Sequence, residues 1–567
     1  MESSILSAPA ASGLRQPQRR PSASRVVFIA IGTALLLSAV LCPLSCVGDP
    51  TWRFRLFQVL AIVFFVPVLL RNLPRRGQAA DVEPPAVAPQ SARFAGLLVA
   101  LAAGASAYAA TIPLYFICDD FEHLALIRHP FMTSLWPQLT KGQFDGLAYI
   151  FYRPVGFASL FLDFRLWHYW APGYHLTNVS LHLLCIAAVF FFCKQLQLKS
   201  ETCMAASLIF AVLPVNVQAV TWIGCRFDQL ATTLGMWSLT SAAHFRRTGK
   251  VSSYAMAILF FALAVTSKES AYVVPILWLA LELIPQDRQP LRPPFARSSA
   301  PLLGYVLAPL LMLFHRLHTL GGIGGYRLTT DGSPLAQSFR TQSLVGILIR
   351  APAETLFGYN WLQPSGRILP LAAGATAAIF LTLCLLAKPT PIGRRITWFC
   401  LIWVFVAPIP THFYFRTPDP GLFSSRAVYF GSIGVSLLLA VLLSQTFSNP
   451  KVSLTWAFSI SLLLLIGLHH NVGAWRSAAQ QSRTFLSSLD SFQPTPPPRA
   501  VFFIKGIPDI VNGVPFFTVG LENAVRFHYS WRDDIRVRTE QSRFVEPWAI
   551  TIDMTSRLKG DPPELPH

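Results

Sequence analysis

Long apolar stretches alternate with short polar connections over most of this chain, from Val26 to Leu468. The stretches run for roughly 16 to 24 residues, which matches the roughly 20 residues that a helix needs to cross the hydrocarbon of a membrane. Strands are excluded at these positions, because in lipid each segment must satisfy its own backbone hydrogen bonds unless a barrel closes. The pattern therefore predicts an all-α polytopic membrane protein.

About thirteen segments meet the length criterion for a transmembrane helix. They are 26–48, 54–71, 94–117, 174–193, 203–219, 229–245, 252–267, 270–285, 301–318, 368–387, 396–410, 427–447 and 452–469. The domain organisation that we predict is a disordered cytoplasmic N-terminus (1–25), two extra transmembrane helices with a linker (26–93), a transmembrane catalytic core (94–475), a second linker (476–498) and a small outer domain (499–567). Short strand-like segments, Ala500–Ile504 and Pro515–Leu521, predict an α/β or β fold for this last domain.

Basic residues gather on every second connection, for example at Arg75–Arg76, Arg246–Arg247 and Arg394–Arg395. Because positive connections stay in the cytoplasm, the N-terminus is expected inside, and the long segment 118–173 and the tail are expected outside. The net charge of +19 does not indicate nucleic-acid binding, since the basic residues form no stripe with interleaved aromatic side chains.

Composition supports the membrane assignment and excludes several classes of soluble enzyme. Hydrophobic residues make up 53% of the chain and charged residues 13%, and the mean hydropathy is +0.47. Most of the nine cysteines lie in apolar stretches, and none forms a CxxC pair, so neither a zinc site nor a disulfide framework is indicated. The chain has no glycine motif for ATP or a dinucleotide.

Two adjacent acids, Asp119 and Asp120, follow the third predicted span directly. A transferase that uses a lipid-phosphate sugar on the outer face needs one carboxylate to deprotonate an acceptor hydroxyl and a second to hold it in place. Adjacent acids also repel each other, which raises one pKa toward a useful value. The alternative interpretation is that the pair caps a helix or lies in water.

Several other polar residues lie at the same predicted side of the membrane. His175, Asn178 and His182 have helical spacing and share one face, where polar residues face a cavity or bond to neighbouring helices. The remaining candidates for substrate binding are Arg153, Arg226, Asp228, Lys268, Glu269 and Arg426. Simple ion pairs, Arg226 with Asp228 and Lys268 with Glu269, are the alternative for four of them.

Positive charge from basic residues on the outer side would stabilise a phosphate leaving group, which gains negative charge as its bond to the sugar breaks. Without a nucleotide motif or a clear metal cluster, arginine or lysine must supply the compensating charge, and the forked guanidinium of arginine suits a phosphate best. We therefore expect Asp119, Arg153, His175, Asn178 and Arg226 to border one outward-opening cavity. No metal ligands are assigned, although isolated acids do not exclude a divalent metal near Asp119.

The order of these motifs resembles the GT-C superfamily of membrane glycosyltransferases, and most closely its protein O-mannosyltransferase-like members, including the transmembrane and tetratricopeptide-repeat mannosyltransferases. The matching pieces are Asp119-Asp120, Tyr152-Arg153-Pro154, Tyr174-His175-x-x-Asn178-x-x-x-His182, Pro214 through Trp222 to Arg226-x-Asp228, Ser267-Lys268-Glu269, Ser425-Arg426-x-x-Tyr429 and Asn471-x-x-x-Trp475. The likeness covers roughly 94–480. It differs from the family pattern in its two extra N-terminal spans and in the lack of tetratricopeptide repeats in the sequence.

The resemblance implies a GT-C-like helical bundle whose first outer acidic motif carries the catalytic carboxylate, here Asp119, with Asp120 as its partner. It also implies inversion of a sugar, a hexose such as mannose, carried by dolichyl or undecaprenyl phosphate. The expected partners are membrane lipid, the polyprenyl-phosphate sugar and an acceptor protein or glycan. Two other classes stay open: a polytopic lipid or glycan transporter or flippase, and an inactive scaffold of a glycan pathway.

Overall fold

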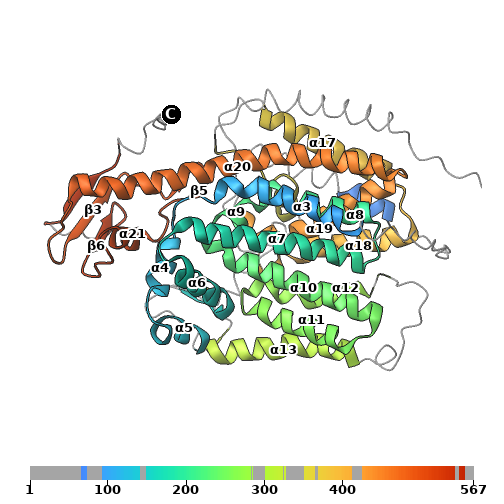
Figure 1. Ribbon diagram of the computed structural model, residues 1–567, viewed down its shortest axis with the longest axis horizontal. Coiled ribbons are helices and arrows are strands. Elements are labelled where there is room, and N and C mark those ends of the chain that lie inside the picture. The colour runs from blue at the N-terminus through green and yellow to red at the C-terminus, as the bar shows by residue number, and fades with distance from the viewer. Residues whose placement is uncertain are drawn as a thin grey trace, which may run out of the picture.

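The computed structural model describes residues 65–72, 92–140, 149–282, 284, 300–322, 325–326, 350–363, 368–411, 424–542 and 548–555. Within these ranges most helices run along the long axis of the molecule, and a small unit with strands lies at one end (Figure 1). The predicted all-α membrane bundle with a small C-terminal α/β unit is confirmed.

The bundle contains α-helices and short 3-10 helices, the latter marked η. In chain order they are α3 (Ala92–Tyr108), η1 (Ala109–Thr111), α4 (Asp120–Ile127), α5 (Phe131–Thr140), α6 (Pro154–Trp167), α7 (Ala171–Gln195), α8 (Ser200–Ala211), η2 (Pro214–Asn216), α9 (Val217–Thr221), η3 (Ile223–Cys225), α10 (Arg226–Thr248), α11 (Val251–Val265), η4 (Glu269–Val273), α12 (Val274–Leu281), α13 (Ala300–Leu320), α16 (Ala351–Leu356), α17 (Ile368–Leu386), α18 (Pro391–Val406), η8 (Ser425–Val428), α19 (Tyr429–Thr446) and α20 (Pro450–Phe492).

Seven of the described helices are long and apolar enough to cross a membrane, or up to eight if the bent pair α8 and η2–α9 forms one span. The predicted count of about thirteen is not confirmed. The predicted span 26–48 lies outside the described residues, and 54–71 is described only from residue 65. Helix α11 and the segment Glu269–Leu281 are apolar but shorter, because the chain breaks at Ser267 and Lys268 between them.

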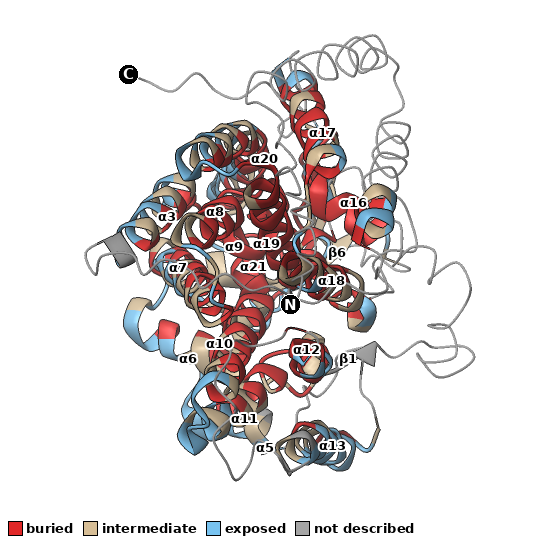
Figure 2. Cartoon of the chain, turned by 90° about the vertical axis from the view of Figure 1, so that its right-hand side faces the viewer, coloured by how far each residue is buried: buried red, intermediate tan, exposed pale blue. Residues whose placement is uncertain are grey.

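Helix α19 forms the centre of the bundle, where Figure 2 shows it surrounded by other helices. In the span Ser425–Thr446, 94% of an 18-residue apolar window is buried inside the protein, whereas in Leu303–Leu320 the share is only 17%. Exposed apolar side chains on α13, such as Leu311 and Phe314, are therefore expected to face lipid. A glycine lets α18 and α19 pack closely, since a Cβ at Gly434 would lie 3.1 Å from Trp403.

A sharp bend of 49° separates α8 from η2 and α9. Pro214 starts η2, and proline has no backbone N–H for a continuous helix. Two asparagines bond to the carbonyl groups near the bend: Asn471 donates to Pro214 O at 3.0 Å, and Asn216 donates to Phe210 O at 3.0 Å. The motif residue Asn471 thus has a structural role at this bend.

Helix α20 is 43 residues long and continues past the bundle toward the C-terminal strands (Figure 1). At 1.5 Å per residue this corresponds to about 65 Å, more than twice the thickness of the hydrocarbon layer. The linker predicted over 476–498 is therefore wrong for most of its length. Apolar residues of this segment, including Phe485 and Leu489, are buried against neighbouring parts of the chain, and this packing stabilises the helix.

The C-terminal unit combines a parallel sheet with one helix. Strand β3 (Val501–Lys505) lies between β6 (Arg536–Thr539) and β7 (Ile550–Asp553), and α21 (Leu521–His528) precedes β6. The first predicted strand matches β3. The second, Pro515–Leu521, is wrong, because only its first residue lies in β5 (Val514–Pro515), which forms a short hairpin with β4 (Ile510–Val511). A further antiparallel pair joins β1 (Tyr149–Ile150) to β2 (Gly325–Tyr326).

Candidate active site

Asp120 is the first residue of α4 and has a structural role. Its Oδ2 atom accepts a hydrogen bond from the Ile117 N–H at 3.0 Å, and its Oδ1 atom accepts one from the Gly224 N–H at 3.0 Å. The side chain is only 1% exposed. Burial, with Asp119 beside it, raises the pKa of Asp120 well above its usual range. Asp120 therefore joins the start of α4 to η3, and both of its oxygens are occupied by backbone groups.

Asp119 immediately precedes α4 but does not cap it through its side chain. Its Oδ1 atom is buried and has no hydrogen-bond partner among the described residues. The same carboxylate lies against the backbone of η3, since a Cβ at Gly224 would approach Asp119 Oδ1 to 2.4 Å. Only glycine fits at position 224 without displacing Asp119. The carboxylate thus keeps unused lone pairs at a position defined by its backbone neighbours.

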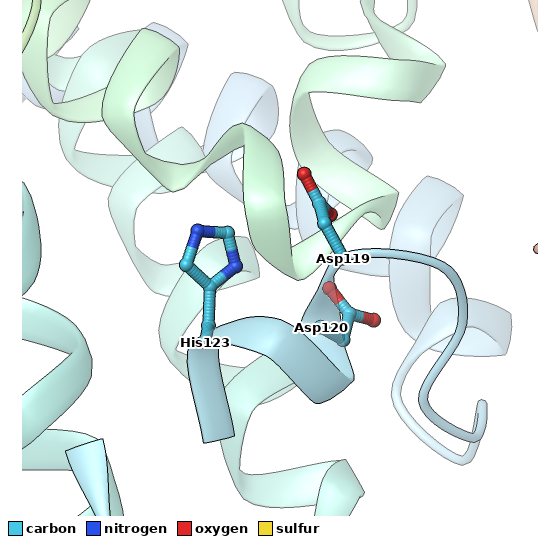
Figure 3. Close-up of side chains that lie close together, drawn as sticks. All are labelled: Asp119, Asp120 and His123. Atoms are coloured by element: carbon cyan, nitrogen blue, oxygen red, sulfur yellow. The ribbon is translucent and has the colours of Figure 1, made fainter. Parts of the chain in front are cut away.

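His123, one turn further along α4, was missed in the sequence prediction. Its ring packs against Phe157 and Phe227, with centroid distances of 6.0 and 5.5 Å, and its Nδ1 atom is buried without a partner in the described chain. Burial lowers the pKa of His123, Asp119 opposes this effect, and Arg153 contributes to it. Figure 3 shows the imidazole on the same side of the turn as Asp119, with Asp120 turned aside. The sequence did contain a signal for His123: it lies four residues after Asp119 at the start of a helix, a spacing that places both residues on one helix face.

Asp119, Asp120 and His123 offer ligand atoms within 4.8 Å of one another. Two carboxylates and an imidazole form a donor set that suits divalent ions such as Mn²⁺ or Zn²⁺. The partnerless Asp119 Oδ1 and His123 Nδ1 atoms are the more available ligands, because Asp120 already accepts two backbone hydrogen bonds. The cluster can therefore act either as a base beside a neutral imidazole or as a cation site.

Arg226, at the start of α10, is fully buried in a network of protein groups. It pairs with Asp163 of α6, its Nε donates to Asn178 Oδ1 at 2.8 Å, and it also donates to the Tyr174 carbonyl at 2.8 Å. Asn178 in turn donates to the Trp222 carbonyl at 3.1 Å. Neither Arg226 nor Asn178 is exposed (0% each). The expectation that both border an open cavity is therefore wrong, because the pairing with Asp163 makes them part of the core.

The other two ion pairs also differ from those considered from the sequence. Lys268 donates to Asp228 Oδ2 at 2.6 Å, and both side chains are buried. Glu269 accepts from Arg153 Nε at 3.0 Å, and Arg316 Nη1 lies 3.9 Å from the same carboxylate. The adjacent residues Lys268 and Glu269 thus take different partners, because the backbone of Lys268 is extended just before η4 and successive side chains there point in different directions.

The three remaining predicted residues lie within the bundle. His182 contacts the Tyr429 hydroxyl at 2.8 Å and the Ala211 carbonyl at 3.2 Å, so it joins three helices. His175 is buried (3% exposed) in the same helix, α7. Arg426 lies over the Trp222 ring at 4.9 Å. The structure therefore gathers Asp119, Asp120 and His123 near the start of α10. His175, His182 and Arg426 instead take part in the packing of helices.

The C-terminal unit packs directly on the acidic turn. Phe517 stacks on Phe121 of α4 with a centroid distance of 6.1 Å, and Phe527 of α21 contacts Phe116 at 6.2 Å. The buried Phe116, Phe121 and Phe517 side chains form part of the continuous apolar core. The unit thus covers the residues on both sides of Asp119 and helps to hold the turn.

The chain is similar to a curated protein O-mannosyl-transferase of Caenorhabditis elegans, with 21% identity over 385 residues, 64% of this chain and 53% of the relative. It thus spans about half the length of that relative (53%). No family model matches the chain.

Among solved structures the chain is similar to the Archaeoglobus fulgidus oligosaccharyltransferase in its apo form (TM-score 0.42, 12% identity, 79% of this chain and 64% of that chain). The complex of that enzyme with Zn and sulfate gives a TM-score of 0.40 at 11% identity, over 78% and 62% of the two chains. The sequence similarity to a protein O-mannosyl-transferase agrees with the resemblance to protein O-mannosyltransferase-like proteins that the motifs indicated.

Proposed function

We propose that this chain is an inverting glycosyltransferase that moves a sugar from a polyprenyl-phosphate carrier to an acceptor on the outer face of a membrane, with Asp119 as the general base. One observation carries the proposal. Asp119 has a buried oxygen without a partner in the described chain, whereas Asp120, Asp163, Asp228 and Glu269 each accept bonds from backbone or basic groups. A base needs an available lone pair at a fixed position.

In the proposed reaction the Asp119 carboxylate takes the proton of an acceptor hydroxyl. The acceptor oxygen attacks the anomeric carbon while the bond from that carbon to the phosphate oxygen breaks, and the phosphate leaves with the electron pair. The sugar is inverted because attack and departure occur on opposite faces. Asp120 positions the turn through its two backbone hydrogen bonds, and burial lowers the pKa of His123, which favours the neutral imidazole.

The buried ion pairs support this role by holding the frame around the base. Arg226 with Asp163 orders the start of α10, next to Gly224 and hence to Asp119. We propose that the donor is a polyprenyl-phosphate hexose, with mannose as the first sugar to test, and that the acceptor is a protein or glycan. The C. elegans relative is named as a protein O-mannosyl-transferase, which motivates both choices.

The decisive experiment incubates the purified full-length chain in lipid nanodiscs with dolichyl- and undecaprenyl-phosphate sugars and an acceptor panel. Consumption of the carrier sugar with inversion at the anomeric carbon is expected, and Asp119→Asn should abolish it. Activity that persists in EDTA supports metal-free base catalysis. Loss in EDTA with recovery on adding Mn²⁺ would instead assign Asp119 and His123 to a cation site. Failure of the folded chain to consume any carrier sugar would contradict the proposal.

A further inference from the structure

A surface groove of about 520 Å³ lies between η1 with the segment that follows it, the start of α7 and the C-terminal third of α20. Its side chains that matter here are Tyr115, Tyr169, Trp170, Arg476 and Arg483. None of the eleven residues predicted for catalysis or substrate binding lines it. The acidic turn is nevertheless near, because Tyr115 precedes Asp119 by four residues and their Cα atoms can be at most about 14 Å apart.

Two arginines make this groove different from the rest of the site. Arg476 and Arg483 are exposed, and neither forms an ion pair or hydrogen bond with any residue that the structure describes. Arg153 and Arg226, by contrast, are paired with Glu269 and Asp163. The two groove arginines are seven residues apart on α20 and therefore share one helix face, about 10 Å apart along the axis. Their long side chains can converge on one anion.

The groove lies at the level where membrane spans end. The span Phe94–Thr111 ends at the first wall of the groove, which includes Ala110, and the span Ala171–Gln195 begins at its second wall. Tyr169 and Trp170 are 43% and 54% exposed there, as is typical of aromatic side chains at a membrane–water interface. Apolar lining residues such as Leu114 and Ala479, beside two exposed arginines, match a molecule with a hydrocarbon tail and a phosphate head.

We propose that this groove binds the phosphate of the polyprenyl carrier, with Arg476 and Arg483 as its ligands. The inference rests on the proposed function. The carrier is favoured over a bulk phospholipid because the groove adjoins the segment that leads to Asp119, where the reacting bond must lie. Loss of the sugar leaves a phosphate monoester, which carries more negative charge than the sugar phosphodiester, and two arginines suit that product well. The arginines thus replace Arg226 as the expected phosphate contact.

The test compares wild type with the Arg476→Gln/Arg483→Gln double variant. Lys451→Gln is the control, because Lys451 is an exposed cation at the other end of the same helix. Undecaprenyl phosphate is titrated into nanodiscs that contain each protein, and binding is measured directly. We expect the double variant to lose at least about ten-fold in affinity and Lys451→Gln to match wild type. In turnover assays the donor KM should rise while kcat at saturation changes little.

Equal affinity of wild type and the double variant would overturn the proposal. Competition by phosphatidylglycerol at the same molar fraction would also overturn it, by showing a site for bulk anionic lipid. Binding that depends on the arginines, without sugar transfer from any carrier, would support the groove and contradict the proposed function. Sugar transfer with an unchanged donor KM in the double variant would support the proposed function and would contradict the groove as the binding site of the carrier phosphate.

Discussion

Gly520 lies so close to Cys118 that a Cβ atom at position 520 would be 2.2 Å from the Cys118 carbonyl oxygen. Gly520 has a φ of +87°, a left-handed conformation that favours glycine, and it immediately precedes α21. Cys118 is the residue before Asp119. The small C-terminal unit therefore contacts the backbone of the acidic turn at a point where no side chain fits.

Gly520→Ala should reduce turnover by about ten- to hundred-fold, because displacement of the turn by even 1 Å disturbs the position of Asp119. Gly321→Ala is the matched control, since Gly321 also has a positive φ (+65°) but nothing lies within 4 Å of its Cβ position. Initial rates measure the loss of turnover. Protease cleavage between residues 493 and 500 reports whether the C-terminal unit is displaced. Equal losses in both variants would attribute the effect to backbone strain alone.

Asp119→Asn keeps the size of the side chain but removes the basic lone pair. We expect turnover to fall by about two to four orders of magnitude while donor affinity is retained, because a base acts mainly in the transition state. Initial rates and direct donor binding are measured in the same nanodisc preparation. Near-normal turnover would exclude Asp119 as the base.

Asp120→Asn should act on stability more than Asp119→Asn does. An asparagine can accept only one of the hydrogen bonds from Ile117 N–H and Gly224 N–H through its oxygen, so one buried donor loses its partner. The cost is about 1–3 kcal/mol of unfolding free energy. Thermal unfolding of the two variants measures the difference. A larger loss of stability in Asp119→Asn would contradict these separate roles.

Arg226→Met should prevent stable folding, because it leaves Asp163 buried without its cation. Removal of one partner of a buried ion pair typically costs about 3–5 kcal/mol. The double variant Asp163→Leu/Arg226→Met should recover much of that stability, since it removes both charges. Recovery of a monodisperse protein after solubilisation measures the outcome. If the double variant is no better than Arg226→Met, the pair is not the main role of Arg226.

Glu122 gives a pH dependence that tests the contact with the C-terminal unit. Burial raises the pKa of Glu122 from 4.5, while a hydrogen bond with Asn523 opposes the shift. A raised pKa means that the folded state holds the proton more tightly than the unfolded state, so this contribution is present below about pH 4.5 and is lost as the pH rises through the folded pKa. Wild type should therefore lose more stability than Glu122→Gln between pH 5 and pH 8. Parallel melting curves would show that the Glu122 carboxyl does not titrate in this way.

Hydropathy alone predicted the helical bundle because lipid leaves few alternatives for a long apolar segment. Hydropathy does not fix the span count at short segments such as α11, where the apolar helix is shorter than the membrane is thick. The continuous α20 was not predicted, because residues beyond 476 look polar along the sequence and their buried face appears only when α20 packs on the C-terminal unit.

The sequence by itself determined where the acidic pair lies and which residue types surround it. The sequence could not assign partners. Arg226 pairs with Asp163, and Lys268 with Asp228, although in each case a residue of opposite charge lies closer in the sequence. It also could not show that Asp120 is saturated while Asp119 keeps a partnerless oxygen. Helical periodicity reports which face a residue occupies, whereas the choice of partner depends on how helices distant in sequence pack. Only tertiary structure decides that choice, because a buried charge is stable only beside the partner that the packing places within hydrogen-bond distance.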